Sequence, residues 1–367
     1  MHENYMSYAL ELAKKGRGKV NPNPLVGAVL IKEGKIIGEG YHEAYGGAHA
    51  EINAIKNASE KIEGATLYVT LEPCNHYGKT PPCTEAIIQS KITRVIVGIR
   101  DPNPLVAGSG IKRLEEAGIE VIVGILEEEC RKLNEIFIKY ITKQEPFVLL
   151  KAAMTLDGKI ATVAGQSKWI TSEASRETAH QLRNVYSGIM VGIETVIKDN
   201  PLLTCRIKNG RSPVIIVLDS TLRIPMNSKI IGGTSKVIIV AVKEIEKLVV
   251  DKVNKLEALG VQVIFVEAYN HRVDLKKLII QLGKLGIDSI LIEGGAEVNA
   301  SALEAGIVDK IQFYIAPNII GGDQAKTPVE GRGIAHLEEA IKVKDLQIQR
   351  IGEDILIEGY IIQKRGD

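Results

Sequence analysis

The chain has 367 residues, enough for two domains with substantial cores. Its 46 Lys and Arg residues nearly balance its 45 Asp and Glu residues, so it has no net electrostatic attraction for a polyanion or an anionic membrane. Aromatic residues make up only 4% of the chain, which argues against general nucleic-acid binding. Its four cysteines are too few for a disulfide framework, and its apolar runs are too short to span a bilayer. We therefore expect a soluble, cytoplasmic protein that binds neither nucleic acid nor membrane.

The hydrophobic pattern of the first part of the chain predicts a layered α/β domain. A helix over residues 5–13 precedes a proline-containing loop and a hairpin that turns at Glu33-Gly34. Strands then alternate with helices, which indicates a largely parallel sheet, and one charged helix over 127–140 closes the domain. The predicted strands are 26–31, 36–41, 66–70, 94–99 and 119–123, and the helices between them are 51–58, 84–90 and 111–117.

A short polar stretch that ends at Pro146 separates this region from a second series of elements. We place the domain boundary there, which gives domains of residues 1–145 and 146–367. The second domain begins with a strand at 147–150 and alternates again, so it is also predicted to be α/β. Its other predicted strands are 214–218, 237–242, 261–265, 290–292, 310–316 and 355–362, and its helices are 173–185, 245–258 and 275–285.

Four residues of the first domain have the pattern of a catalytic zinc site. His49 and Glu51 open a helix, Cys74 follows a strand, and Cys83 precedes another helix. One imidazole and two thiolates leave the fourth zinc position to water, and nucleobase deaminases combine this set with a glutamate that moves protons. His49, Cys74 and Cys83 are therefore the predicted ligands, and Glu51 the predicted catalytic acid and base. Because residues two apart on a regular helix point in nearly opposite directions, we expect His49 and Glu51 on an irregular first turn.

Two structural alternatives compete with this interpretation. The residues could be an unrelated surface pair and two buried cysteines, but the ordered pattern of all four argues against it. A closed structural zinc with His76 as the fourth ligand is the stronger alternative, although it leaves Glu51 without a role.

Longer motifs identify a family. Eight residues separate the two cysteines, in place of the two that are usual in deaminases. Together with the motifs at 23–28, 47–51 and 101–104, this spacing closely resembles the bifunctional deaminase–reductases of riboflavin biosynthesis. The resemblance covers nearly the whole chain, because it continues through 151–158, 167–171, 199–201 and 293–295.

The resemblance implies two consecutive reactions. A domain of cytidine-deaminase fold with one zinc ion would deaminate 2,5-diamino-6-ribosylamino-4(3H)-pyrimidinone 5′-phosphate. A domain similar to dihydrofolate reductase would then use NADPH to reduce the ribosyl group of 5-amino-6-(5-phosphoribosylamino)uracil to ribityl. We also expect a homo-oligomer. The resemblance assigns deaminase substrate contacts to Asn23, His42, His76, Lys79, Thr80, Asp101 and Asn103.

The second domain lacks the Gly-x-Gly-x-x-Gly of a standard dinucleotide site. A strand, the turn at 293–295 and a following helix could instead present backbone N–H groups to a pyrophosphate, or the glycines could merely form a tight connection. The resemblance assigns NADPH contacts to Ala153, Trp169, Thr195, Asp199, Gly295, Ala296 and Glu297, and substrate contacts to Ser167, Arg183, Leu203, Arg206 and Glu293.

The chemistry of these residues is consistent with such roles. Arg183 and Arg206 suit a phosphate because a guanidinium binds two oxygens at once, although each could be a solvated surface charge, and Trp169 could be a core residue. Hydride delivery to the sugar C1′ needs an acid near the ring oxygen or nitrogen, and Lys151 and Asp199 are the candidates.

Two other functions fit the zinc pattern. One is a single-activity deaminase of another pyrimidine or of tRNA adenosine, with a non-catalytic assembly domain; it would release ammonia without consuming NADPH. The other is a non-enzymatic interaction module stabilised by zinc, which chelation would unfold.

Overall fold

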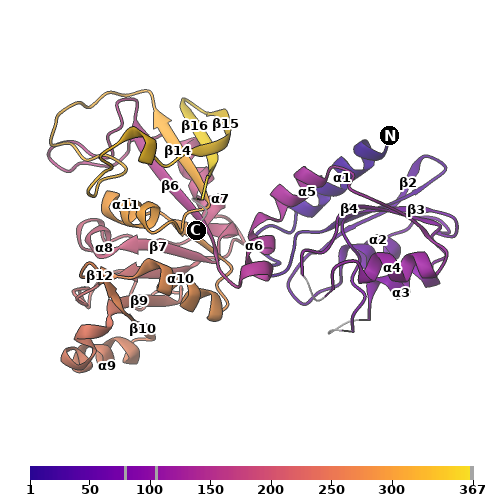
Figure 1. Ribbon diagram of the computed structural model, residues 1–367, viewed down its shortest axis with the longest axis horizontal. Coiled ribbons are helices and arrows are strands. Elements are labelled where there is room, and N and C mark those ends of the chain that lie inside the picture. The colour runs from indigo at the N-terminus through magenta and orange to yellow at the C-terminus, as the bar shows by residue number, and fades with distance from the viewer. Residues whose placement is uncertain (78–80, 104–105, 364–367) are drawn as a thin grey trace. The chain divides into compact units, whose positions relative to one another are not determined.

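The computed structural model describes residues 1–77, 81–103 and 106–363 (Figure 1). The chain divides into two compact units, Met1–Gln144 and Glu145–Asp367. No helix in the described part is both long and apolar enough to cross a bilayer.

The first unit is built on a five-stranded sheet in the order β2-β1-β3-β4-β5. β1 pairs antiparallel with β2 and β3, whereas β3, β4 and β5 are parallel, so the predicted hairpin and parallel region are confirmed. Glu33 and Gly34 both have positive φ, at 49° and 76°, which suits a tight hairpin turn. The strands are β1 (Gly27–Lys32), β2 (Lys35–Tyr41), β3 (Thr66–Leu71), β4 (Arg94–Ile99) and β5 (Glu120–Val123).

Helices cover both faces of this sheet, with α1 and α5 on one side and α2, α3 and α4 on the other (Figure 1). α2 packs closely on β2, because a Cβ atom on Gly40 would lie only 2.5 Å from the carbonyl oxygen of Ala50. That contact fixes the start of α2, where the predicted zinc motif lies. The helices are α1 (His2–Lys14), α2 (Ala50–Lys56), α3 (Cys83–Gln89), α4 (Ser109–Glu116), α5 (Glu127–Leu133) and α6 (Glu135–Lys143).

The single helix predicted over 127–140 is wrong, because the chain breaks at Asn134 into α5 and α6. The Asn134 side chain is 2% exposed. Its Oδ1 accepts a hydrogen bond from the backbone N–H of Leu25 at 2.8 Å, and its Nδ2 donates to the carbonyl oxygen of Leu25 at 3.0 Å. The Asn134 amide is thus hydrogen-bonded to the backbone of a segment that is distant in sequence, and the helix is interrupted at that residue.

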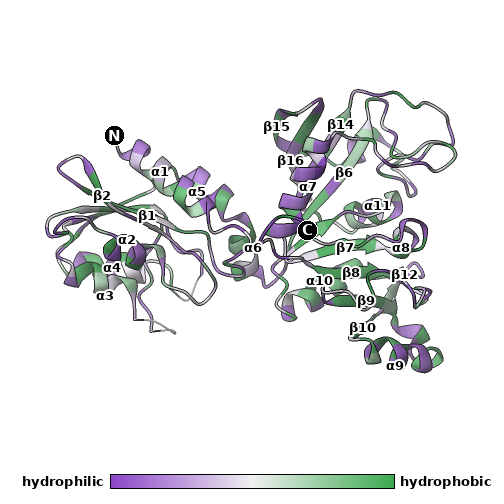
Figure 2. Cartoon of the chain, turned by 180° about the vertical axis from the view of Figure 1, so that it is seen from behind, coloured by the Kyte–Doolittle hydropathy of each residue, from purple (hydrophilic) through white to green (hydrophobic). Residues whose placement is uncertain are grey.

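The second unit contains a nine-stranded sheet in the order β10-β9-β8-β7-β13-β6-β14-β16-β15. The first seven of these strands are parallel, and β16 and β15 complete one edge in antiparallel pairing. The central strands β7, β8 and β9 are largely hydrophobic in Figure 2, as expected of strands buried on both faces. The strands are β6 (Phe147–Thr155), β7 (Gly188–Gly192), β8 (Val214–Leu218), β9 (Val237–Val242), β10 (Val261–Val266), β13 (Ser289–Ile292), β14 (Lys310–Ala316), β15 (Val343–Ile351) and β16 (Asp354–Ile361), and a separate ribbon is formed by β11 (Ala268–Tyr269) and β12 (Arg272–Val273).

The helix predicted over 245–258 is also wrong in its first part. Residues Lys243–Leu248 form a 3-10 helix, η1, and the α-helix α9 begins only at Val250. The intervening residue, Val249, has φ −118° and ψ 16°, outside the α-helical region. The α-helices of this unit are α7 (Glu173–Val185), α8 (Ile193–Asp199), α9 (Val250–Ala258), α10 (Leu275–Lys284) and α11 (Ala296–Glu304), and a second 3-10 helix, η2, covers Leu337–Glu339.

Candidate active sites

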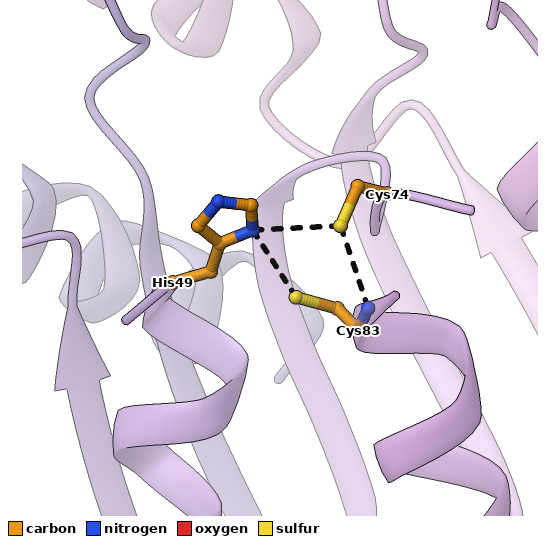
Figure 3. A group of neighbouring side chains, drawn as sticks. All are labelled: His49, Cys74 and Cys83. Atoms are coloured by element: carbon orange, nitrogen blue, oxygen red, sulfur yellow. Dashed lines mark hydrogen bonds between the residues drawn. The ribbon is translucent and has the colours of Figure 1, made fainter. Parts of the chain in front are cut away.

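The first unit brings the three predicted zinc ligands together (Figure 3). Nδ1 of His49 lies 3.4 Å from Sγ of Cys74 and 3.2 Å from Sγ of Cys83. His49 precedes α2 in an extended conformation (φ −73°, ψ 164°), while Glu51 lies within the first turn, as the irregular-turn prediction requires. Cys74 follows β3, and Cys83 is the first residue of α3.

The donor set fits a tetrahedral zinc ion. Bonds of about 2.1 Å to nitrogen and about 2.3 Å to sulfur place the donor atoms about 3.6 Å apart at tetrahedral angles, close to the observed separations. These three residues form the one cluster of His, Cys, Asp or Glu ligand atoms that could hold a metal within the described residues, and His76 is not part of it. The geometry therefore favours an open site with three ligands over the closed site with His76.

The two cysteines interact directly through their polar atoms. The backbone N–H of Cys83 donates to Sγ of Cys74 at 3.4 Å, which directs the start of α3 toward that sulfur. A hydrogen bond from the Cys83 thiol lowers the pKa of Cys74 well below its usual range, and His49 contributes to the same shift. A thiol that ionises readily is suited to bind a metal.

Glu51 lies beside this cluster and is 3% exposed. Burial raises the pKa of its carboxyl to about 7, and the negative charge of the nearby Cys74 contributes to the increase. A carboxyl that titrates near neutral pH can both accept and return a proton.

A cavity of about 370 Å³ opens on this cluster. His49, Cys74 and Glu51 line it, together with apolar side chains of β3 and α6. Five of the seven predicted deaminase substrate contacts also line it, namely Asn23, His42, His76, Asp101 and Asn103. The other two, Lys79 and Thr80, lie outside the described residues.

His42 is held in one orientation on the cavity wall. Its Nδ1 lies 3.0 Å from the carbonyl oxygen of Ala48, so Nδ1 carries the proton and Nε2 accepts from Nδ2 of Asn23 at 3.2 Å. Burial lowers the pKa of His42, which favours this neutral form. Through this hydrogen bond the buried His42 fixes the orientation of the Asn23 amide.

Sequence reasoning missed three contributors to this site. Phe137 and Ile141 reach the cavity from α6, and a break in an otherwise continuous helical pattern gave no signal of that placement. Glu72 also lines the cavity, and its position between a strand and Pro73-Cys74 was the available signal.

The second unit gathers three predicted site residues in a buried charged cluster. Nε of Arg183, on α7, donates to Oε2 of Glu293 at 3.2 Å, and Nζ of Lys151, on β6, lies 4.0 Å from Oε1 of Glu293. The Lys151 and Glu293 side chains are only 16% and 10% exposed. Although burial alone would raise the pKa of Glu293, Lys151 and Arg183 lower it, so the residue is a carboxylate. Arg183 is therefore not a solvated surface charge.

Two other predicted substrate contacts, Leu203 and Arg206, lie close to this cluster. The Arg183 guanidinium donates to the carbonyl oxygen of Thr204 at 3.2 Å, next to the buried Leu203. His180, which sequence reasoning missed, also belongs here: burial and the charges of Arg183 and Arg206 lower its pKa. Arg206 itself is exposed, and Ser167 is half-buried.

The predicted cofactor contacts are more scattered. β13, the turn and α11 form the expected strand–turn–helix, with Gly295 directly before Ala296 and Glu297 at the start of α11. A Cβ atom on Gly295 would lie 3.7 Å from Oγ1 of Thr195, so these two predicted contacts are neighbours. The side chain of Glu297 is paired with Arg272 at 2.7 Å.

Three further predicted residues lie elsewhere in this unit. Trp169 is 69% exposed, so it is not a core residue. The guanidinium carbon of Arg176 lies 4.7 Å from the centroid of the Trp169 ring. Ala153 lies on β6, paired with Tyr314. Asp199 is exposed at the end of α8, and no hydrogen bond or ion pair within the described residues joins it to Lys151.

Comparison with known proteins supports a deaminase domain in the first unit and a reductase domain in the second. Residues 1–99 match the cytidine and deoxycytidylate deaminase zinc-binding region, and residues 146–357 match the RibD C-terminal domain. The riboflavin biosynthesis protein RibD of Actinobacillus pleuropneumoniae is 50% identical over 98% of this chain and 95% of its own length. The corresponding protein of Aquifex aeolicus is 48% identical over 97% of each chain.

Two solved structures are similar over nearly their whole length. RibD of Acinetobacter baumannii superposes with a TM-score of 0.88 at 36% identity, covering 99% of each chain. The diaminohydroxyphosphoribosylaminopyrimidine deaminase/5-amino-6-(5-phosphoribosylamino)uracil reductase of Thermotoga maritima gives 0.84 at 40% identity, covering 98% of this chain and 99% of its own.

Fold, site and comparisons together define a zinc-dependent deaminase domain of cytidine-deaminase type joined to an NADPH-dependent reductase domain. The chain belongs to the RibD family and carries out deamination and reduction in riboflavin biosynthesis. The alternatives of a single-activity deaminase and of a non-enzymatic zinc module are not favoured, because the match to the family includes the reductase half.

Proposed function

We propose that the first unit deaminates 2,5-diamino-6-ribosylamino-4(3H)-pyrimidinone 5′-phosphate and that the second reduces the ribosyl group of the product. The observation that carries this proposal is the convergence of His49, Cys74 and Cys83 beside the buried Glu51, at a cavity with polar walls. We further propose, from the near-zero net charge, that neither nucleic acid nor membrane is a partner. We propose that the protein is cytoplasmic because its four cysteines form no disulfide among the described residues, as suits a reducing compartment.

In the deaminase unit we assign zinc binding to His49, Cys74 and Cys83. When bound there, zinc supplies a Lewis acid that acidifies a water molecule. Glu51 acts on the protons: its carboxylate accepts one as water adds to the amidine-like ring carbon, and the resulting carboxyl returns one to the departing amine, so that ammonia leaves. The raised pKa of Glu51 supports both directions of transfer.

The polar cavity walls supply the substrate contacts in this proposal. Asn23 and Asn103 offer donors and acceptors for a pyrimidine edge, and His42 orients the Asn23 amide. His76 and Asp101 are assigned to the ribose phosphate and ring, together with Lys79 and Thr80, which lie outside the described residues.

In the reductase unit we assign the substrate phosphate to Arg183 and Arg206, with Ser167, Leu203 and Glu293 as further substrate contacts. The proximity of Arg183, Leu203 and Glu293 supports this grouping. Lys151 is supported as the proton donor by its half-buried position beside Glu293. Asp199, the other candidate, is supported only by the resemblance.

NADPH supplies the hydride in this unit. We assign its phosphates to the backbone N–H groups at Gly295, Ala296 and Glu297, because these residues begin α11 and the first N–H groups of an α-helix precede any intrahelical acceptor. Thr195 is supported as a neighbouring contact by its closeness to Gly295. Ala153, Trp169 and Asp199 complete the assigned cofactor contacts.

We also propose that the protein is a homo-oligomer. β15 is an edge strand that exposes Leu346 and Ile348 by 58% and 71%, and an apolar edge of this kind favours association with another chain. Sedimentation at micromolar concentration tests this: the proposal predicts a mass of at least two chains, and a monomer contradicts it.

The two-step function is tested with the purified, zinc-loaded protein. Given the diaminopyrimidinone substrate and NADPH, it is expected to release one ammonia and oxidise one NADPH per substrate molecule. Ammonia release without NADPH oxidation would refute the reductase assignment, and NADPH oxidation only with deaminated substrate would refute the deaminase assignment.

A further inference from the structure

Glu72 makes a hydrogen-bond arrangement that the deamination chemistry does not use. Its side chain is 5% exposed, and its two carboxylate oxygens accept four backbone N–H groups. Oε2 accepts from Asp101 and Gly108, both at 3.0 Å. Oε1 accepts from Gly110 at 2.9 Å and from Ile111 at 3.2 Å. One buried charge thus binds both ends of the segment that follows β4.

This segment forms part of the cavity wall. Asp101 and Asn103 both line the cavity. Oδ1 of Asp101 accepts from the N–H of Asn103 at 2.9 Å, and the Asn103 carbonyl oxygen accepts from Val106 and Ala107 at 3.0 and 2.9 Å. Glu72 holds the N–H at the start of this hydrogen-bonded turn, so the position of the wall depends on the carboxylate.

The same residue begins the segment that carries a predicted zinc ligand. Cys74 is two residues after Glu72, and Pro73 between them contacts the start of α4 so closely that a Cβ atom on Gly110 would lie 2.0 Å from the Pro73 carbonyl oxygen. Nδ2 of Asn75 also donates to the carbonyl oxygen of Ser109 at 3.3 Å. The metal-binding segment and the cavity wall are therefore packed on each other with Glu72 between them.

We propose that Glu72 is a positioning residue that fixes the Asp101–Asn103 wall at a set distance from the zinc ligands and so determines how well the pyrimidine substrate binds. This proposal rests on the deaminase function assigned above. Its chemical basis is that a carboxylate is acceptor-only, and no neutral side chain of the same shape offers two oxygens to four donors. In a Glu72→Gln variant, the amide NH2 would face two backbone N–H groups, and the two hydrogen bonds to those groups would be lost.

The principal experiment is the kinetics of ammonia release by Glu72→Gln. Because the wall binds parts of the substrate away from the reacting carbon, the change should remove binding shared by substrate and transition state. The expected result is a rise in KM of about tenfold with kcat changed less than about threefold, with zinc content and NADPH oxidation of deaminated substrate equal to the parent.

Glu85→Gln is the matched control. Glu85 lies on α3 and also contacts α4, through a 2.8 Å ion pair with Arg113. It is partly exposed, and among the described residues it bonds none of the wall. The same substitution there should leave KM unchanged. A double-mutant cycle with Asn103→Ala separates positioning from general stability: Glu72→Gln should add little in that background, because the wall contact is already lost.

Each outcome decides the proposal. A zinc-loaded Glu72→Gln protein with the parental KM overturns it, and so does loss of zinc, since Glu72 would then serve the metal ligand and not the wall. If the variant does not fold, amide hydrogen exchange of the parent protein decides: slow exchange at Asp101, Gly108, Gly110 and Ile111 supports the proposal, and fast exchange overturns it. Absence of ammonia release by the parent would refute the proposed function, while hydrogen exchange still tests the contact.

Discussion

Arg183 donates two hydrogen bonds to a single oxygen of Glu293, while the other oxygen, Oε1, has no hydrogen-bond partner within the described residues and faces Lys151 at 4.0 Å. A buried acceptor without a partner costs free energy unless a ligand donates to it. The arrangement orients Arg183, and it leaves Oε1 open to a donor, as the proposed role of Glu293 in substrate binding requires.

Replacing Arg183 by Ala should weaken the reductase strongly. The variant would lose the phosphate contact proposed for Arg183, a charge-assisted bond worth about 1.5–3 kcal/mol, so KM or turnover should worsen by roughly tenfold or more. Arg206→Ala should behave similarly, and ammonia release by either variant should equal the parent.

Two comparisons separate phosphate binding from positioning of Glu293. With a substrate that lacks the 5′-phosphate, the penalty of Arg183→Ala should largely disappear. Arg183→Lys should restore only part of the loss, because an ammonium keeps the charge but cannot make the fixed guanidinium bonds to both Glu293 and the Thr204 carbonyl. Unchanged kinetics in both the Arg183→Ala and Arg206→Ala variants would show that the phosphate binds elsewhere.

Zinc binding should distinguish Cys83 from His76. Cys83→Ser removes a thiolate donor, so metal analysis of the purified variant should find zinc greatly reduced and ammonia release lost. His76→Ala should retain about one zinc per chain, because His76 lies outside the cluster of ligand atoms. Equal loss of zinc in both variants would favour the closed site.

Chelation of the parent protein extends this test to the second unit. Ammonia release should stop, whereas NADPH oxidation with deaminated substrate should continue, since the predicted zinc ligands all lie in the first unit. Loss of both activities on chelation would mean that zinc also supports the reductase.

Asn134→Ala should destabilise the first unit. The change leaves the backbone N–H and carbonyl of Leu25 without their side-chain partner, at a cost of about 1–3 kcal/mol for each group that water cannot reach. Urea unfolding followed by a probe in this unit measures the effect. Asn57→Ala is a suitable control, because the Asn57 side chain makes a similar bond to the carbonyl of Glu39 at an exposed position. Equal stability of the parent and the Asn134→Ala protein would contradict this account of the helix break.

The sequence predicted elements with strong local patterns. The hairpin at Glu33-Gly34, helix α7 and strand β14 were predicted closely, because turn residues or apolar periodicity mark each of them. The metal cluster was predictable for a similar reason: His49, Cys74 and Cys83 are chemically unusual and occur at strand and helix ends.

Tertiary contacts account for what the sequence did not reveal. The break at Asn134 depends on a hydrogen bond to Leu25, 109 residues away, and local periodicity carries no information about it. β15 was missed because it is an edge strand whose side chains are mostly exposed, including Leu346 and Ile348, so no buried apolar face marks it in the sequence. His180 was missed because nothing on α7 distinguishes it until the fold places it beside Arg183 and Arg206.

The most direct test of the account is Glu51→Gln, measured for both activities in one preparation. The substitution retains the size of the side chain and all three predicted zinc ligands but removes the proton-accepting carboxylate, whose contribution is typically about 10²–10⁴-fold. The account predicts a folded, zinc-containing protein with ammonia release reduced to that extent and with NADPH oxidation of 5-amino-6-(5-phosphoribosylamino)uracil close to the parental rate. Ammonia release at the parental rate, or loss of NADPH oxidation in a folded protein that retains zinc, would contradict it.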